Sequence, residues 1–208
     1  MNKTIVVSII LAICFLVTTV LAETQASSTT TEDHFGYYQT TVKSYVKKDM
    51  KKTAEELRKF GSFLNLEIES SKEETKILIK ASADEMEELA KKLDANTEVT
   101  RTEIDQAFAR AYQRLSQKYY EASRESWVKK DVKKAGEAMN KAEQYLEDGA
   151  KAINHKVTPA VVSTFHKVVK KLSEGKDWVE DETGKAMDDL GTEIKKLGDK
   201  ISNDKPAK

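Results

Sequence analysis

Apolar and small side chains between Asp49 and Leu93 recur at steps of mostly four and three residues. This spacing places them on one face of an α-helix, so it predicts a single amphipathic helix of about 43 residues, roughly 65 Å long. A bend near Ser70-Ser71 is expected. The positions on this face are Met50, Ala54, Leu57, Gly61, Leu64, Ile68, Thr75, Leu78, Ser82, Met86, Leu89 and Leu93.

A second helix is predicted from the capping-box spacing of Thr100 and Glu103, in which the side chains of both residues satisfy free backbone N–H groups. It is expected to run to about Lys129 and to lie antiparallel on the helix before it. Its predicted inner face holds Ile104, Phe108, Ala111, Leu115, Tyr119, Ala122 and Ser126.

The segment Tyr37–Lys52 returns as Tyr119–Lys134, offset by 82 residues and identical at nine of sixteen positions. In each copy a helix ends at a Lys-Lys pair, and the aspartate that follows is placed to cap the next helix. Asp49 and Asp131 are these predicted N-caps. The sequence therefore predicts an all-α fold, an elongated antiparallel helical bundle over 33–201 that contains a duplicated helix-turn-helix unit, with copies that start near 37 and 119.

The end of the chain is expected to form two further helices. Thr158-Pro159 fits an N-cap followed by a proline in the first turn, which ends one helix near His155 and starts another. Gly175 is expected to end that helix, and an amphipathic helix is predicted over 177–201. This last helix carries Met187, Leu190, Ile194, Leu197 and Ile201 in heptad positions, which are typical of a coiled coil.

Three glycines of the last helix, Gly184, Gly191 and Gly198, are spaced seven residues apart. Each costs about 1 kcal/mol of helix stability relative to alanine. One interpretation is that they form a helix contact, because a stripe without side chains lets another helix or surface approach closely. The other interpretation is a loosely stable amphipathic tail helix.

The first residues differ from the rest of the chain. Lys3 is followed by an almost unbroken apolar stretch from Ile5 to Leu21, and Ala22 completes a small-residue cleavage motif. We expect a signal peptide over 1–22 and an exported protein, periplasmic or secreted. The alternative is a retained anchor, because the stretch approaches the length of a membrane span. A flexible Ser/Thr-rich spacer over 23–32 and a disordered tail over 202–208 are also expected.

Composition removes several kinds of function. Cys14 is the only cysteine and precedes the expected cleavage site, which excludes disulfides and cysteine-ligated metals from the mature chain. The chain has 35 basic and 35 acidic residues, so no overall field favours nucleic acid as a partner. The histidines His34, His155 and His166 lack metal-ligand spacing, and no phosphate loop or nucleophile motif is present. We therefore expect no enzyme activity, no cofactor and no metal.

Two features remain as candidate binding sites. The twin turns place lysines around a helix N-terminus, where ammonium and free N–H groups could bind a phosphate or acidic lipid head group. The alternative is that these lysines only solubilise a tight turn whose dipole the aspartates offset. Tyr37, Tyr38 and Tyr45, with Tyr119, Tyr120 and Trp127, are either a ligand cradle or core packing. The candidate anion-site lysines are Lys47, Lys48, Lys51, Lys52, Lys129, Lys130, Lys133 and Lys134.

Some segments resemble parts of known families. The hairpin Trp127–Met139, with small residues after its turn, is similar to tetratricopeptide helix pairs, and the export signal with helical repeats is similar to small periplasmic stress proteins. The glycine-heptad helix is similar to amphipathic helices of apolipoproteins and desiccation proteins. Each similarity covers only a helix or two, so the chain is not assigned to a family.

The sequence thus predicts a non-enzymatic exported helical-bundle protein with a binding, scaffolding or envelope-protective role. The alternative is an amphipathic-helix protein that binds lipid or a membrane surface. The expected partners are accordingly another protein, a second copy of the chain, or an anionic lipid surface.

Overall fold

The computed structural model describes residues 34–173 and 180–203, which belong to one compact unit. The predicted signal peptide over 1–22 and the spacer over 23–32 lie outside the described residues. The expected helix end at Gly175 and the start of the last helix at 177 lie outside them as well. Of the predicted tail over 202–208, Ser202 and Asn203 belong to a helix, and 204–208 lie outside the described residues.

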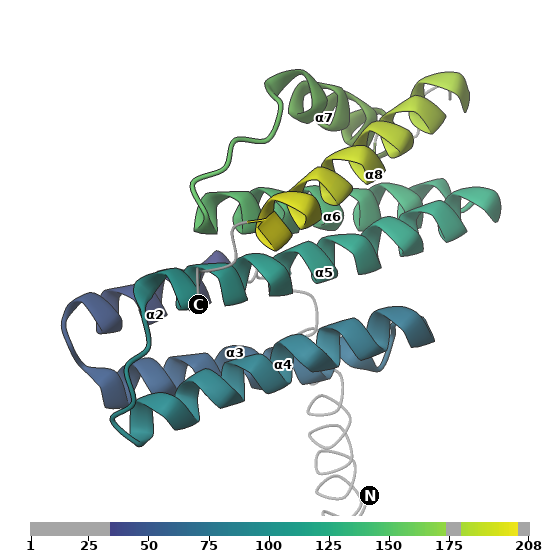
Figure 1. Ribbon diagram of the computed structural model, residues 1–208. Helices are drawn as coiled ribbons and strands as arrows, with labels where there is room; N and C mark the ends of the chain where they lie inside the picture. Colours follow the sequence, from purple (N-terminus) through teal and green to yellow (C-terminus); the bar gives the residue numbers. More distant parts are fainter. Residues whose placement is uncertain (1–33, 174–179, 204–208) are drawn as a thin grey trace, which may run out of the picture. The chain divides into compact units, whose positions relative to one another are not determined.

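The described residues form seven α-helices and no strand, which confirms the all-α class. Successive helices from α3 to α6 reverse direction at each connection (Figure 1), so the antiparallel bundle is confirmed too. The helices are α2 (Phe35–Val46), α3 (Met50–Ile68), α4 (Glu73–Asp94), α5 (Arg101–Val128), α6 (Val132–Ala152), α7 (Pro159–Ser173) and α8 (Glu180–Asn203).

The prediction of one helix from Asp49 to Leu93 is wrong, because the chain reverses inside it. α3 ends at Ile68, and α4 packs back along α3 as a hairpin. At the end of α3 the Ser71 amide donates to the carbonyl of Ile68 and its hydroxyl donates to the carbonyl of Glu67 at 2.9 Å. These bonds close the last turn of α3 in place of a further helical turn.

The spacing of apolar residues continues in phase across this reversal, which is why periodicity alone predicted one helix. Five of the six predicted inner positions of α4 are buried, namely Thr75, Ser82, Met86, Leu89 and Leu93, and only Leu78 departs from the prediction. Leu78 is 44% exposed, whereas Ile79 is fully buried against the core. Because α4 packs against both α3 and α5, it buries a wider stripe than the predicted row, and this stripe also includes Ile79, Ala83 and Ala90.

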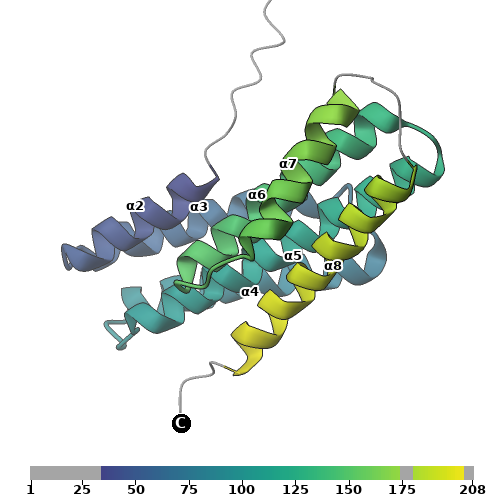
Figure 2. The same cartoon turned by 90° about the horizontal axis from the view of Figure 1, so that it is seen from above.

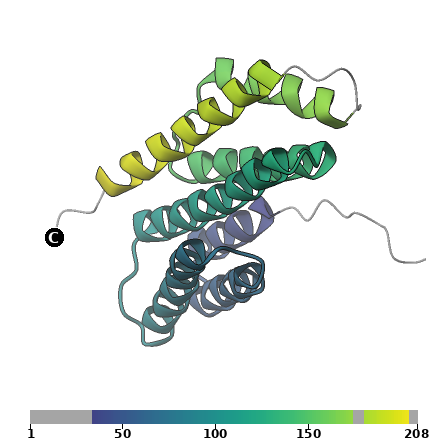
Figure 3. The ribbon, with the colours of Figure 1, turned by 90° about the vertical axis from the view of Figure 1, so that its right-hand side faces the viewer.

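The α5–α6 hairpin lies between the other helices (Figures 2 and 3). α2 and α4 contact α5 on one side, and α7 and α8 contact the hairpin on the other side. α5 therefore buries most of its circumference, beyond its predicted inner face. Ile104, Phe108, Ala111 and Leu115 are buried as predicted, but Ala122 is exposed and the neighbouring Ser123 is buried.

An aromatic cluster fills the space between α2, α3, α5 and α6. Phe60 stacks on Phe108 with ring centroids 4.6 Å apart, and Tyr145 stacks on Tyr119 at 5.6 Å. Tyr38 is buried, and the other five members of the predicted aromatic stripe are partly buried against the core. The core-packing interpretation of the stripe is confirmed.

The two repeat copies form the same turn, which confirms that Asp49 and Asp131 are N-caps. Lys48 and Lys130 adopt left-handed backbone conformations, with φ of 60° and 59°. In each copy this residue reverses the chain after the helix in a Schellman arrangement, a place that glycine usually takes. The matching hydrogen bonds are Asp49 N to Ser44 O at 3.1 Å, Asp131 N to Ser126 O at 2.9 Å, Lys52 N to Asp49 Oδ1 at 3.1 Å and Lys134 N to Asp131 Oδ1 at 3.3 Å.

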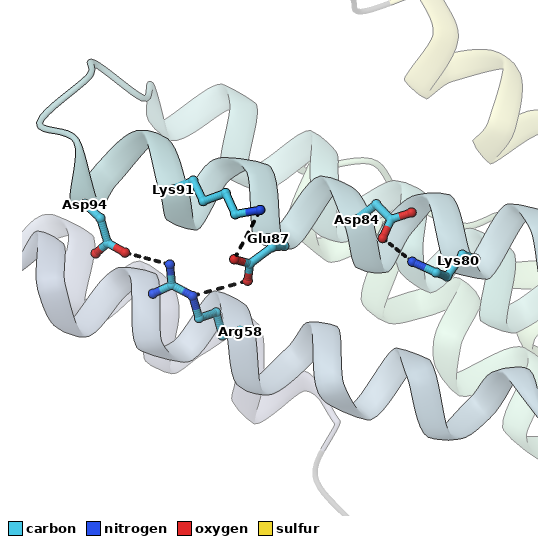
Figure 4. Close-up of polar contacts among 6 residues, drawn as sticks. All are labelled: Arg58, Lys80, Asp84, Glu87, Lys91 and Asp94. Atoms are coloured by element: carbon cyan, nitrogen blue, oxygen red, sulfur yellow. Dashed lines mark hydrogen bonds and ion pairs between the residues drawn. The ribbon is translucent and has the colours of Figure 1, made fainter.

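Ion pairs join α3 to α4 along the outside of their hairpin (Figure 4). Arg58 of α3 reaches two carboxylates of α4, Glu87 at 3.2 Å and Asp94 at 2.6 Å. All three side chains are more than a third exposed, so we expect a small contribution to stability. Lys80 and Asp84 form a further pair within α4.

Partly buried polar contacts tie α2 and α3 to α5. The Tyr38 hydroxyl donates to Asp105 at 2.9 Å, and Arg101 donates to the same carboxylate at 2.6 Å. Lys118, which is almost fully buried, donates to the Glu67 carbonyl at 2.8 Å and pairs with the Glu67 carboxylate at 2.5 Å. The Lys118 ammonium lies at the C-terminus of α3, where a cation is favourable for the helix dipole. Together these contacts join α2 and α3 to α5.

Candidate anion-binding surface

The eight lysines predicted as an anion site lie in two exposed turns at opposite ends of the bundle (Figure 1). The α2–α3 turn holds Lys47, Lys48, Lys51 and Lys52, and the α5–α6 turn holds Lys129, Lys130, Lys133 and Lys134. Because α3, α4 and α5 run in alternating directions, the start of α3 and the end of α5 face opposite ways. The two sets of lysines therefore cannot converge on one ligand.

Within each turn the chain's own aspartate occupies the place that an anion would take. Asp49 and Asp131 accept the free N–H groups of the first helical turn. The Lys134 ammonium lies 2.9 Å from Asp131, and this hydrogen bond holds the pKa of the Asp131 carboxyl below its usual value. A phosphate at this helix start would have to displace a carboxylate that the turn already satisfies.

Two of the three glycines in the last helix lie against α5. A Cβ atom built on Gly191 would lie 2.7 Å from the Tyr120 hydroxyl, and one on Gly198 would lie 3.4 Å from the Gln113 side chain. A Cβ on Gly184 would meet nothing within 4 Å. The apolar heptad residues beside the stripe, from Met187 to Ile201, are all buried. α8 therefore approaches α5 most closely at Gly191.

The histidines are dispersed. His34 packs among aromatic rings, 4.9 Å from Phe63 and 5.2 Å from Tyr145. His166 is exposed on α7, with Nε2 3.4 Å from the Glu143 carboxylate of α6. Over residues 34–173 and 180–203, no three His, Cys, Asp or Glu side chains are grouped so that they could hold a metal ion.

One surface differs in charge from the rest of this neutral chain. Between Asp148 and Glu174 the sequence contains five lysines and two histidines and no acidic residue. α7 lies within this run, and its Lys167, Lys170 and Lys171 are exposed. The neighbouring α8, by contrast, carries seven acidic residues and four lysines. α7 is thus a cationic strip on the side of the α5–α6 hairpin away from α3 and α4 (Figure 3).

Two open grooves flank this strip. The first has a volume of about 580 Å³, and its apolar end at Val157, Pro159 and Val162 leads past His166 into a cationic end at Lys167 and Lys170. The second, of about 440 Å³, lies between α7 and α8 and contains Lys167, Lys171 and Lys185 beside Asp189. Cations outnumber carboxylates in both grooves. No ion pair joins Lys167 to another residue within the described ranges.

A buried carboxyl group lies beneath the strip. Glu143 of α6 is 3% exposed, and its Oε1 lacks a hydrogen-bond partner among the described residues. Burial raises the pKa of Glu143 to about 7, and the nearby Glu147 carboxylate adds to the effect. The Glu143 charge is therefore partly suppressed at neutral pH, so it offsets less of the positive charge of α7 than a fully ionised carboxylate would.

The predicted anion site of the repeated turns does not include the lysines of α7, which lie outside the repeated segment. The signal was present as a run of 25 residues, 149–173, without an acidic residue in a chain that is one-third charged. A count of acidic residues along the chain would have found it. Which of these lysines are exposed, and which apolar residues lie beside them, required the packing of α7 on α6 and α8.

Comparisons with known proteins found no match for this chain among protein-family models, curated proteins or solved structures. The inference of function therefore rests on the residues and their arrangement. None of the helices in the described ranges combines the length and the apolar character needed to cross a membrane.

Proposed function

We propose that this chain is a non-enzymatic, exported binding protein that engages an anionic partner through α7. In this proposal the α3–α4 and α5–α6 hairpins are a scaffold, and α7 is the surface that they present. Such an activity would suit a scaffolding or envelope-protective role. Export is inferred from the apolar segment over 1–22 and its Ala22 cleavage motif.

The observation that carries the proposal is the set of exposed lysines on α7, within the run 149–173 that contains no acidic residue, in a chain with no net charge. Many other cationic side chains are paired with carboxylates between helices, as Arg58 is with Glu87 and Arg110 with Glu85. Local charge of one sign attracts a partner of the other sign even when the whole molecule is neutral. The lysines of the twin turns are less suited to this role, because their capping aspartates lie among them.

A soluble polyanion tests the proposal without assuming a partner. Dextran sulfate binding is measured by isothermal titration for the full chain and for the triple variant Lys167→Gln, Lys170→Gln and Lys171→Gln. The matched control is Lys47→Gln, Lys51→Gln and Lys52→Gln, which removes the same charge from the α2–α3 turn. Circular dichroism checks that each variant keeps its helix content.

The α7 variant should lose about tenfold or more in affinity at low salt, whereas the control should lose much less, because the α2–α3 turn contains the capping carboxylate of Asp49 and the run 149–173 contains no acidic residue. Equal losses in the two variants would mean that net charge alone matters, and the proposal would fail. A larger loss in the control would move the binding surface to the α2–α3 turn.

A further inference from the structure

The exposed surface of α7 is divided along the helix into an apolar part and a cationic part. Pro159, Val162, His166 and Lys170 follow one another at helical steps of three and four residues, so they lie on one stripe of the helix. The apolar residues occupy its N-terminal half, and the imidazole and the ammonium group occupy its C-terminal half. Ala160 and Lys171 repeat the same order in the groove toward α8.

We infer that the partner of this surface is an anionic phospholipid bilayer, on which α7 lies flat; this inference rests on the proposed function. A bilayer interface offers acidic phosphates beside hydrocarbon, and amphipathic helices with lysines next to apolar side chains match that boundary. Lysine stems can cover apolar surface while their ammonium groups reach the phosphates. Val157, Pro159 and Val162 enter the interface as Lys167 and Lys170 contact the lipid phosphates.

The chemistry of the strip favours a bilayer over the other polyanions. Nucleic acids are bound through arginine forks and through aromatic rings that stack on bases. α7 contains no arginine, and its single aromatic residue, Phe165, is fully buried. A folded acidic protein would have to match the apolar end with a shaped pocket, whereas a fluid bilayer adapts to it. Partly exposed valines contiguous with lysines are therefore best accommodated by lipid.

The geometry of the bundle leaves α7 accessible for this contact. Among the described helices, α7 packs mainly against α6 and α8. It lies on the outside of the α5–α6 hairpin (Figures 2 and 3). Phe165, Val168 and Leu172 remain in the core, so docking needs no unfolding of the helix. The bound state is a peripheral one, in which the described helices keep their packing.

The test is flotation of the full chain with vesicles of phosphatidylcholine, with or without one-quarter phosphatidylglycerol. Any binding by residues 1–22 is common to all variants and to both vesicle types, so the difference between vesicles isolates the charge-dependent part. The variants are the α7 lysine triple, its α2–α3 control and Val162→Ser, which removes an apolar contact and keeps every charge. Dextran sulfate binding of the same variants is measured in parallel.

We expect the wild type to prefer the anionic vesicles by about tenfold or more, and the α7 triple to lose that preference, because each lysine near an acidic membrane contributes about fivefold. Val162→Ser should weaken vesicle binding severalfold and leave dextran sulfate binding unchanged. Equal vesicle binding by Val162→Ser and wild type would overturn the lipid inference, as would an absent preference for anionic vesicles. If the lipid inference is overturned but dextran sulfate binding still depends on the α7 lysines, the proposed function stands. If the α7 triple variant changes neither vesicle binding nor dextran sulfate binding, the proposed function and the lipid inference both fail.

Discussion

The two copies of the repeat share a turn and differ in almost everything that surrounds it. Lys48 and Lys130 have φ values within 1° of each other, and the capping aspartates accept equivalent N–H groups. The tyrosines at matching positions have different partners. The Tyr38 hydroxyl donates to Asp105 of α5, whereas the Tyr120 ring packs against the backbone of Gly191 in α8.

The difference follows from the helices that cover each copy. The second helix of the first copy, α3, packs against α4, and the second helix of the second copy, α6, packs against α7 and α8. Gly61 in α3 lies close to the backbone of Ala83 in α4, and its counterpart in α6 is Glu143, which faces His166 of α7. A turn is determined by its own few residues, whereas each helix face is adapted to its neighbour.

The largest expected effect concerns Glu143, a carboxyl group at the position that Gly61 takes in the first copy. Its pKa is raised by burial from 4.5 to about 7, so the folded state holds this proton more tightly than the unfolded chain does. The resulting stability is complete below pH 4.5 and is lost as the pH rises to about 7. Glu143→Gln keeps the shape of the side chain and removes the charge. It should stabilise the protein at pH 8 by as much as about 3 kcal/mol and change little at pH 4.5.

Urea titrations at pH 4.5, 6 and 8 measure this difference. The matched control is Glu56→Gln in α3, a buried carboxylate whose Oε1 lies 2.7 Å from the Lys59 ammonium. Because that carboxylate has a cationic partner, the control should not be stabilised at pH 8. Loss of stability in Glu143→Gln at pH 8 would instead show that the folded state favours the ionised Glu143 carboxylate, and the burial argument would be wrong.

A smaller effect is expected from substitution of Gly191, because the change breaks the contact with Tyr120 that is specific to the second copy. A Cβ atom here would lie 2.7 Å from the Tyr120 hydroxyl and 2.9 Å from Cζ of its ring. Gly191→Leu should therefore cost about 1–3 kcal/mol, despite the better helix propensity of leucine. Gly184→Leu is the control; it has open space and should gain up to about 1 kcal/mol with higher helicity.

Thermal and urea unfolding of both variants, and of Gly191→Leu combined with Tyr120→Ala, complete the comparison. In the double variant the leucine no longer overlaps the Tyr120 ring, so part of the stability that Gly191→Leu loses should be restored. A Gly191→Leu protein that is more helical and more stable than the wild type would mean that α8 does not pack closely on α5 in solution.

Features with a local cause could be predicted from the sequence. The caps at Thr100 and Asp131 require only a side chain and the backbone three residues on, and both are formed. The heptad positions from Met187 to Ile201 are buried because any neighbour would select that stripe. The all-α class followed from the same periodicity.

Features that depend on a neighbour could not be predicted. The reversal at Ser71 was hidden because the residues on both sides of it share one helical phase. The contact of Gly191 with Tyr120 joins residues far apart in sequence, and spacing identified the glycine without its partner. Periodicity identifies the face that is buried, so the exposed cationic face of α7 became visible only after its buried face was known.

The smallest expected effect tests whether the two turns are equal in energy as well as in shape. A lysine in the left-handed region carries a steric cost of about 1 kcal/mol, which glycine does not have. Glycine also raises the entropy of the unfolded chain, and this offsets part of the gain.

Lys48→Gly and Lys130→Gly should each stabilise the protein by about 0.5 kcal/mol, and by the same amount in both copies. Asn96→Gly, at φ of 53°, should gain less because asparagine tolerates this conformation better than lysine. Urea titrations check these values: the midpoint should shift, while the slope of the unfolding free energy against urea concentration stays the same. Unequal gains at Lys48 and Lys130 would show that the turns differ in their surroundings, since their backbone geometry is the same.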